Sequence, residues 1–135
     1  KEQKVRGIEL EGNFSFQKLS VQANYTFTEK VKQEPLRLPK HAANVGLTYA
    51  AAKAQWGAHF RYVGSRYDAD FSTYPSTTQK LKEFALVDVR VTLPNFIGNA
   101  NVSLAVTNLF DVSYKEFIGY SVLGKNLNIG LQYAF

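Results

Sequence analysis

The sequence predicts an all-β protein made of antiparallel strands of the transmembrane β-barrel type. Two observations carry this prediction: apolar and polar residues alternate with a period of two along most of the chain, and the connections between alternating segments are short and long in strict turn. A barrel strand shows alternate side chains to lipid and to water, and its barrel has tight turns at one end and extended loops at the other. The mean hydropathy of −0.23 fits such strands, because only every second residue meets lipid.

The first two segments, about residues 5–17 and 19–28, establish the pattern. Their apolar positions recur at every second residue, whereas Glu9 and Glu11 lie on the polar parity of the first segment. Each segment is close to the 9–11 or so residues that cross a bilayer as a tilted strand. The apolar positions are Ile8, Leu10, Phe14, Phe16, Val21, Ala23, Tyr25 and Phe27.

Two long polar loops surround the next pair of segments, about residues 41–50 and 55–62. The first loop, 29–40, contains two prolines, which resist pairing within a sheet. The second, 64–82, is rich in Ser, Thr, Tyr and Asp and is expected to be irregular. Arg61 lies on the polar parity between them, where its charge would meet water rather than lipid.

The last three segments are expected at about residues 83–93, 100–108 and 126–135. A turn over 94–99 separates the first two, and a third long loop, 109–124, precedes the last. Asp88 and Arg90 occupy polar positions, and the chain ends on the aromatic residue Phe135. The apolar positions are Ala85, Val87, Val89, Val91, Leu93, Val102, Leu104, Val106, Leu127, Ile129, Leu131 and Tyr133.

The count of about seven strands indicates that the chain does not close a barrel alone. Bacterial single-chain barrels have an even number of strands, and a spanning strand with an unpaired edge is not stable in lipid. The sequence has no methionine, even at position 1. We therefore expect residues 1–135 to be the C-terminal part of a larger barrel, completed by strands outside this sequence.

Composition argues against several other classes of protein. The absence of cysteine removes zinc knuckles, iron–sulfur clusters and disulfide scaffolds. His41 and His59 lack a paired-ligand spacing, and Asp68 and Asp70 lack the remaining positions of a calcium loop, so neither a metal nor another cofactor is expected. No Gly-x-Ser-x-Gly elbow occurs, and an enzyme is not expected.

The net charge of +5 comes from lysines and arginines that are scattered or lie in predicted loops. We interpret these as solvated loop charges, with contact to anionic lipid head groups such as lipopolysaccharide as the second interpretation. No nucleic-acid partner is expected, because the aromatic residues lie on the outward parity that suits lipid and its interface.

Several motifs resemble the TonB-dependent outer-membrane receptors. They are Val5 to Glu11, Leu38 to His41, Thr107-Asn108-Leu109-Phe110-Asp111, Tyr114 and Gly119-Tyr120. The resemblance implies a bacterial outer-membrane barrel of about 22 strands with a plugged lumen. It also implies a plug domain and a contact with TonB, both outside this chain, and it makes Phe135 an assembly signal.

Within this family, the stretch from Arg66 to Pro75 is similar to a loop of the cobalamin (vitamin B12) receptor. The resemblance implies active uptake of a large, scarce ligand, with cobalamin favoured and a ferric siderophore or haem as alternatives. Side chains at the outer mouth would bind it through aromatic and hydrogen-bonding groups. The outer-loop residues expected to contact ligand are Arg37, Phe71, Ser72, Tyr74 and Tyr120.

A second set of polar residues is expected to face the lumen: Glu9, Glu11, Arg61, Asp88 and Arg90. These side chains would pair either with the plug or with one another across neighbouring strands. Two rival functions remain at this stage. One is a barrel enzyme with paired catalytic residues at its rim, and the other is a small structural barrel that closes by oligomerisation.

Overall fold

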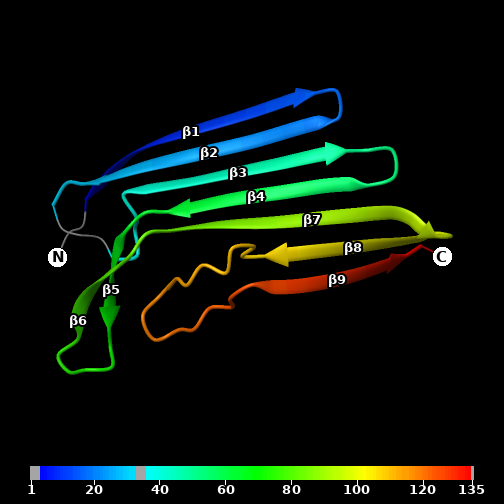
Figure 1. The fold of residues 1–135 in the computed structure, drawn as a ribbon. Coiled ribbons are helices and arrows are strands. Elements are labelled where there is room, and N and C mark those ends of the chain that lie inside the picture. The colour runs from blue at the N-terminus through cyan, green and yellow to red at the C-terminus, as the bar shows by residue number, and fades with distance from the viewer. Residues whose placement is uncertain (1–3, 33–35, 135) are drawn as a thin grey trace.

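The structure is a computed structural model that describes residues 4–32 and 36–134. Its described residues form strands and connections only, in the order shown in Figure 1. No helix in these ranges has the length and apolar character needed to cross a bilayer. The strands are β1 (Val5–Phe16), β2 (Leu19–Lys30), β3 (His41–Ala50), β4 (Gln55–Val63), β5 (Arg66–Asp70), β6 (Thr77–Leu81), β7 (Phe84–Ile97), β8 (Ala100–Thr107) and β9 (Asn126–Tyr133).

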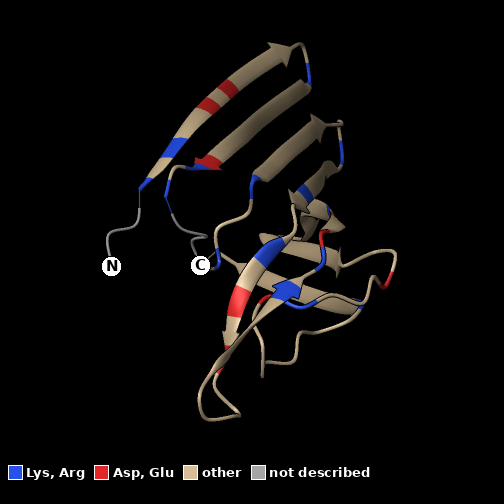
Figure 2. Ribbon diagram, turned by 90° about the vertical axis from the view of Figure 1, so that its left-hand side faces the viewer, with Lys and Arg blue, Asp and Glu red and all other residues tan. Residues whose placement is uncertain are grey.

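Seven of these strands form one antiparallel sheet in the order β1-β2-β3-β4-β7-β8-β9. The three short turns lie at one end of the sheet and the three long connections at the other (Figure 1). Viewed from the side, the strands follow a curved path and the β5–β6 hairpin projects from it (Figure 2). The predicted seven-strand meander with alternating loop lengths is confirmed.

The strand register places the apolar parities of all seven strands on one face. Residues that are opposite one another in an antiparallel pair point to the same side, so a continuous row of partners defines a face. Leu127, Ile129 and Leu131 of β9 are 64%, 72% and 74% exposed, so no other part of the described chain covers them. One apolar row crosses the whole sheet through Phe14, Val21, Leu47, Ala58, Val89, Val106 and Leu127.

The opposite face carries the polar parity. Glu11, Asn24, Asn44 and Arg61 are successive partners across the first four strands, and the amide of Asn44 donates a hydrogen bond to Asn24 at 3.0 Å. This arrangement is typical of the wall of a transmembrane barrel, which has lipid on one side and water on the other. Within the described residues β1 and β9 each have one neighbour in the sheet, so the wall is open at both edges.

The predicted turn at 94–99 is wrong for most of its length, because β7 continues to Ile97. The register slips between Leu93 and Ile97, which leaves Pro94 in an irregular stretch where no ladder hydrogen bond is needed from it. The backbone N–H of Asn95 instead donates to the side-chain oxygen of Asn101 at 2.9 Å. The actual turn occupies Gly98 and the residue after it.

The second long connection, expected to be irregular, contains the β5–β6 hairpin. Five registered pairs join the two strands, from Arg66 opposite Leu81 to Asp70 opposite Thr77. The polar composition of this segment masked the alternation of its side chains between two sides of the hairpin. Arg66 and Asp68 are buried on one side, and Tyr67 lies on the other. A hairpin this short depends on packing against other elements, and that packing forms the site described next.

Candidate functional site

Three connections meet at the long-loop end of the sheet. We call them the loop cluster, defined as Leu36 and Arg37, the β5–β6 hairpin, and residues 108–125 between β8 and β9. Leu36 forms an isolated bridge with Tyr67, and the Arg37 N–H donates to the Tyr67 carbonyl at 2.7 Å. Side-chain hydrogen bonds and ion pairs, described below, hold the three connections together.

Asp68 joins all three connections through one carboxylate. Its side chain is fully buried. Oδ1 accepts hydrogen bonds from Arg37 Nε at 2.7 Å and from the Ala69 N–H at 2.9 Å, and Oδ2 accepts one from the Ile118 N–H at 2.8 Å. Burial acts to raise the pKa of Asp68, but the hydrogen bonds from Arg37, Ile118 and Ala69 outweigh it and hold this pKa below its ordinary value.

Glu116 provides a second junction, between the β8–β9 connection and two arginines. Its carboxylate lies 2.7 Å from Nη2 of Arg61 on β4 and 3.5 Å from Nη2 of Arg66 on β5. The same Arg66 nitrogen donates to the carbonyls of Lys115 and Glu116, at 2.9 and 2.7 Å. Burial lowers the pKa of Arg66, whose side chain is only 3% exposed, and this group remains a cation at any ordinary pH.

An apolar patch lies beneath these charges. Val63, Phe84 and Leu86 pack together, with Val112 and Tyr114 from the β8–β9 connection against them. The Phe84 and Tyr114 ring centroids are 4.5 Å apart. Leu86 is the register partner of Arg61, so this patch belongs to the polar face. The β8–β9 connection therefore folds back over that face instead of extending away from the sheet.

Asn108 fixes the point where the chain leaves β8. Its side chain is buried. Its backbone has the left-handed conformation, with φ of 50°, which asparagine tolerates better than most residues. Its N–H donates to Asp88 Oδ1 at 2.8 Å. Its side-chain amide donates to the Val112 carbonyl at 3.0 Å and accepts from the Val112 N–H at 2.8 Å. These bonds close a tight loop over residues 108–112.

Asp111 ties the two ends of the β8–β9 connection to each other. Its N–H donates to the Asn108 carbonyl at 2.9 Å, and its Oδ1 accepts from the Lys125 N–H, next to β9, at 2.8 Å. Gly124 runs so close that an added Cβ would lie 2.7 Å from the same oxygen. Sequence reasoning singled out this Asn-Leu-Phe-Asp motif by resemblance, and its geometry is that of a loop anchor.

Two of the predicted ligand contacts, Arg37 and Tyr120, are brought together by Phe117. The guanidinium carbon of Arg37 lies 5.0 Å from the Phe117 ring centroid, and the Tyr120 ring meets Phe117 edge-on at 6.3 Å. Tyr120 is 71% exposed. Arg37 also forms an ion pair with Asp68, so it stabilises the loop cluster in addition to any contact with a ligand. Phe117 was missed because nothing in its sequence context distinguished it from other loop aromatics.

The other three predicted contacts form the tip of the β5–β6 hairpin. Phe71 is largely exposed and Tyr74 is fully exposed. The N–H and hydroxyl of Ser72 both donate to Asp70 Oδ1, at 2.9 and 2.6 Å, and they lower the pKa of that carboxyl. The tip is thus shaped by Asp70 and presents two aromatic rings to solvent. That these residues contact a ligand remains a prediction.

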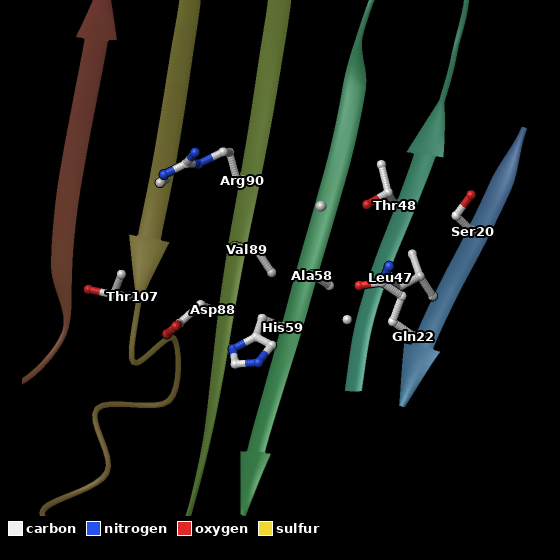
Figure 3. A pocket seen from close by; sticks show the side chains of 13 residues that line it. Ser20, Gln22, Leu47, Thr48, Ala58, His59, Asp88, Val89, Arg90 and Thr107 are labelled. Atoms are coloured by element: carbon white, nitrogen blue, oxygen red, sulfur yellow. The ribbon is translucent and has the colours of Figure 1, made fainter. Parts of the chain in front are cut away.

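The residues predicted to face the lumen all lie on the polar face. Arg61 pairs with Glu116, and Asp88 accepts from Asn108, so both engage the β8–β9 connection. Arg90 and Asp88 line a recess of about 420 Å³ together with His59 (Figure 3), and Gly46 and Gly57 also belong to its lining. Glu9 and Glu11 are exposed on β1. That this face surrounds a lumen stays a prediction.

Asp68, Arg66 and Glu116 carry most of the loop cluster, and none was proposed for a structural role from sequence. A usable signal existed, because Arg66 and Asp68 alternate with Tyr67 and Ala69 as strand residues do. Phe135 lies outside the described residues, and its expected role in assembly is untested. Among residues 4–32 and 36–134 no group of three His, Cys, Asp or Glu side chains is placed to hold a metal ion.

Comparison with solved structures finds the same fold in sections of larger outer-membrane receptors. The pyoverdine receptor FpvA of Pseudomonas aeruginosa, bound to pyoverdine, matches with a TM-score of 0.80 and 19% identity over 97% of this chain and 21% of that chain. A ferripyoverdine-bound structure of the P. aeruginosa receptor matches with a TM-score of 0.77 and 20% identity, over 96% of this chain and 19% of that chain. The ferric-catecholate import receptor Fiu of E. coli matches with a TM-score of 0.70 and 23% identity over 96% and 19%.

These similarities establish the fold of the chain and show how much of a complete receptor it covers. The chain spans about a fifth of the length of the solved receptors that it matches. The open sheet is therefore a section of a larger barrel, as the strand count predicted. A protein-family model described as "TonB dependent receptor-like, beta-barrel" matches residues 1–109. The chain belongs to this family of TonB-dependent receptors, whose β-barrels lie in the bacterial outer membrane.

Proposed function

We propose that the complete protein imports a ferric siderophore through the bacterial outer membrane, and that the loop cluster forms part of its binding surface. The observation that carries this proposal is the presence of two exposed aromatic surfaces at the long-loop end. One is the hairpin tip with Phe71 and Tyr74, and the other is Tyr120 on Phe117. Aromatic rings beside polar groups are typical of a site for a large, partly apolar ligand.

The matched structures support the choice of ligand class, since they are receptors for ferripyoverdine and for a ferric catecholate. TonB, the plug and the remaining strands are the partners that this proposal requires, and all would be supplied outside residues 1–135. Family membership favours transport over the barrel enzyme and over the small oligomeric barrel that the sequence left open.

Cobalamin is the second candidate, and one observation favours it. The stretch from Arg66 to Pro75, which resembles a loop of the cobalamin receptor, forms β5 and the hairpin tip where a ligand contact is expected. The comparisons give cobalamin no support, because the matched structures are siderophore receptors.

Uptake by cells that express the complete receptor tests the proposal. The probes are radiolabelled ferric catecholate, ferric hydroxamate and ferripyoverdine chelates, with labelled cyanocobalamin in a separate arm. We expect energy-dependent uptake of an iron chelate that is lost in cells lacking TonB. Uptake of cyanocobalamin alone would select the second candidate, and uptake of no probe would contradict both.

Aromatic substitutions connect the uptake to the site. Tyr120→Ala and Tyr74→Ala should each weaken binding of the transported chelate about tenfold, since an aromatic contact contributes on the order of 1–2 kcal/mol. Phe96→Ala is the matched control, because Phe96 is 58% exposed but lies at the short-turn end. If all three variants bound the chelate with equal affinity, Tyr120 and Tyr74 would not be part of the binding surface.

A further inference from the structure

The polar face is hollowed at the middle of the wall. We call this hollow the mid-wall recess, defined by its lining residues Gln22, Thr48, His59, Asp88 and Arg90. Its volume of about 420 Å³ falls in the range of roughly 300–1,000 Å³ that is typical of small-molecule sites. The charged side chains of β7 lie on one side of it, and the hydroxyl and amide side chains of β2 and β3 lie on the other (Figure 3).

Two glycines give the mid-wall recess its floor. The register pairs Gly46 of β3 with His59 and Gly57 of β4 with Arg90. A Cβ added at Gly46 would meet nothing within 4 Å, and one added at Gly57 would make only ordinary contacts at 3.9 and 4.0 Å. Packing within residues 4–32 and 36–134 therefore requires neither glycine, although each costs strand stability relative to alanine. Their effect is to keep this part of the wall open to a group that approaches from the polar side.

The mid-wall recess continues into a second hollow beside the β8–β9 connection. His59, Asp88 and Thr107 line both hollows. The second one, of about 440 Å³, is also lined by Leu86 of β7 and by Tyr114 of the connection. Leu86 and Arg90 are separated by about 14 Å along β7, because a strand rises about 3.4 Å per residue. A continuous depression therefore leads from the loop cluster to the middle of the polar face.

Arg90 is the exposed cation of the mid-wall recess. Its register partners are Gly57 on one side and Ala105 on the other, so neither neighbouring strand covers it. The ion pairs formed among residues 4–32 and 36–134 do not include Arg90. Asp88, the carboxylate in the lining, accepts a hydrogen bond from the Asn108 N–H, which partly offsets its charge. The recess thus offers a guanidinium with open donor positions, which is well suited to an anionic oxygen.

We propose that the mid-wall recess is a second binding site for the transported ferric chelate, and that it holds an anionic oxygen group of the chelate, a carboxylate or a phenolate, at Arg90. This inference rests on the proposed function and on the prediction that the polar face lines a lumen. Gln22 and Thr48 can donate accompanying hydrogen bonds from the opposite side of the recess. The site lies farther from the long-loop end than the exposed aromatic rings of the loop cluster. It therefore acts on the passage of the chelate and not on its capture.

Transport kinetics of the complete receptor test the role of Arg90. The probes are radiolabelled ferric catecholate, ferric hydroxamate and ferripyoverdine, and the chelate that the wild type imports is carried forward. Its dissociation constant is measured in de-energised cells and its maximal uptake rate in energised cells. Arg90→Gln should lower the maximal rate about fivefold and leave the dissociation constant unchanged, since one charge-assisted contact in an exposed position contributes about that factor. Arg90→Lys should retain most of the rate, because it keeps the charge.

A steric variant tests the recess without altering its charge. Gly57→Val fills the floor and should also lower the maximal rate without changing the dissociation constant. Gly12→Val is the matched control, because it adds the same side chain to the apolar face, where nothing lies within 4 Å. Lys18→Gln, in a short turn, is the control for loss of a cation. Both controls should import at the wild-type rate, and equal receptor levels and melting temperatures verify that each variant is folded.

The outcomes separate this site from the proposed function and from a seat for the plug. Wild-type rates in both Arg90→Gln and Gly57→Val would overturn the second site and leave the proposed function intact. Failure of the wild type to import any of the three chelates would contradict the proposed function itself. If Arg90→Gln instead admitted vancomycin, which is too large to cross an intact outer membrane, the recess would hold the plug in place, and the second site would be overturned.

Discussion

Replacing Asp68 with asparagine should release the β8–β9 connection from the hairpin without altering the barrel wall. The carboxylate accepts hydrogen bonds at both oxygens, from Arg37 and Ala69 at Oδ1 and from Ile118 at Oδ2. Asparagine keeps one acceptor oxygen. If that oxygen stays toward Arg37, the new amide N–H₂ faces the Ile118 N–H, and two donors oppose each other. The bond across to the β8–β9 connection is then lost.

The size of the effect follows from the two interactions removed. A hydrogen bond to a buried charged acceptor contributes about 1.5–3 kcal/mol. The ion pair with Arg37 adds at most about 1 kcal/mol, because the Arg37 side chain is 49% exposed and screened by solvent. We expect local stability of the connection to fall by about 2–3 kcal/mol, which shifts its opening equilibrium by a factor of roughly 30–150.

Amide hydrogen exchange of the complete receptor, followed by mass spectrometry, measures this opening directly. Peptides covering residues 113–123 should exchange faster by about that factor in Asp68→Asn, while peptides of β4 and β9 keep wild-type rates. Asp70→Asn is the matched control, because the Asp70 carboxylate accepts hydrogen bonds from Ser72 and Gln79 of its own hairpin. Unchanged exchange over 113–123 in Asp68→Asn would refute the assignment of Asp68 as the junction.

Three further predictions concern the same loop cluster. Asn108→Ala removes both side-chain bonds to Val112 and should lower the melting temperature of the complete receptor by a few degrees; an unchanged value would deny Asn108 its anchoring role. Gly124→Ala should displace the Asp111 carboxylate from the Lys125 N–H and speed exchange at that amide about tenfold; wild-type exchange there would contradict the close approach. The folded pKa of Asp68 lies below its ordinary value of 3.8, so its stabilisation is complete above that pH and is lost as the pH falls through the folded pKa. Loop exchange, corrected for its intrinsic pH dependence, should accelerate in that acid range in wild type and show no such transition in Asp68→Asn.

The sheet could be predicted from sequence because each strand depends on a local signal. Alternation in β9, from Leu127 to Tyr133, is sufficient to define both faces of that strand, and the loop rhythm then sets the direction of every neighbour. The continuation of β7 past Pro94 could not be predicted in this way. It depends on Asn101 of the next strand, which supplies the acceptor that the irregular backbone needs.

The loop cluster was not predictable to the same degree, because its contacts join residues that are distant in sequence. Asp68 meets Ile118 fifty residues later, and no periodicity connects the two. Arg37 was chosen as a ligand contact from its loop position and charge. Its engagement with Asp68 and Phe117 is a matter of three-dimensional packing. Tyr120 was chosen by resemblance, and its neighbour Phe117 became visible only in the fold.

The central claim is that alternate residues of each strand in the sheet meet lipid and water. Spin labels at single cysteines in β9 test it most directly, since residues 1–135 contain no native cysteine. In the complete receptor reconstituted in bilayers, labels at Leu127→Cys, Ile129→Cys and Leu131→Cys should be relaxed mainly by oxygen. Labels at Asn128→Cys and Gln132→Cys should be relaxed mainly by a water-soluble nickel chelate. Accessibility without this period of two would contradict the account.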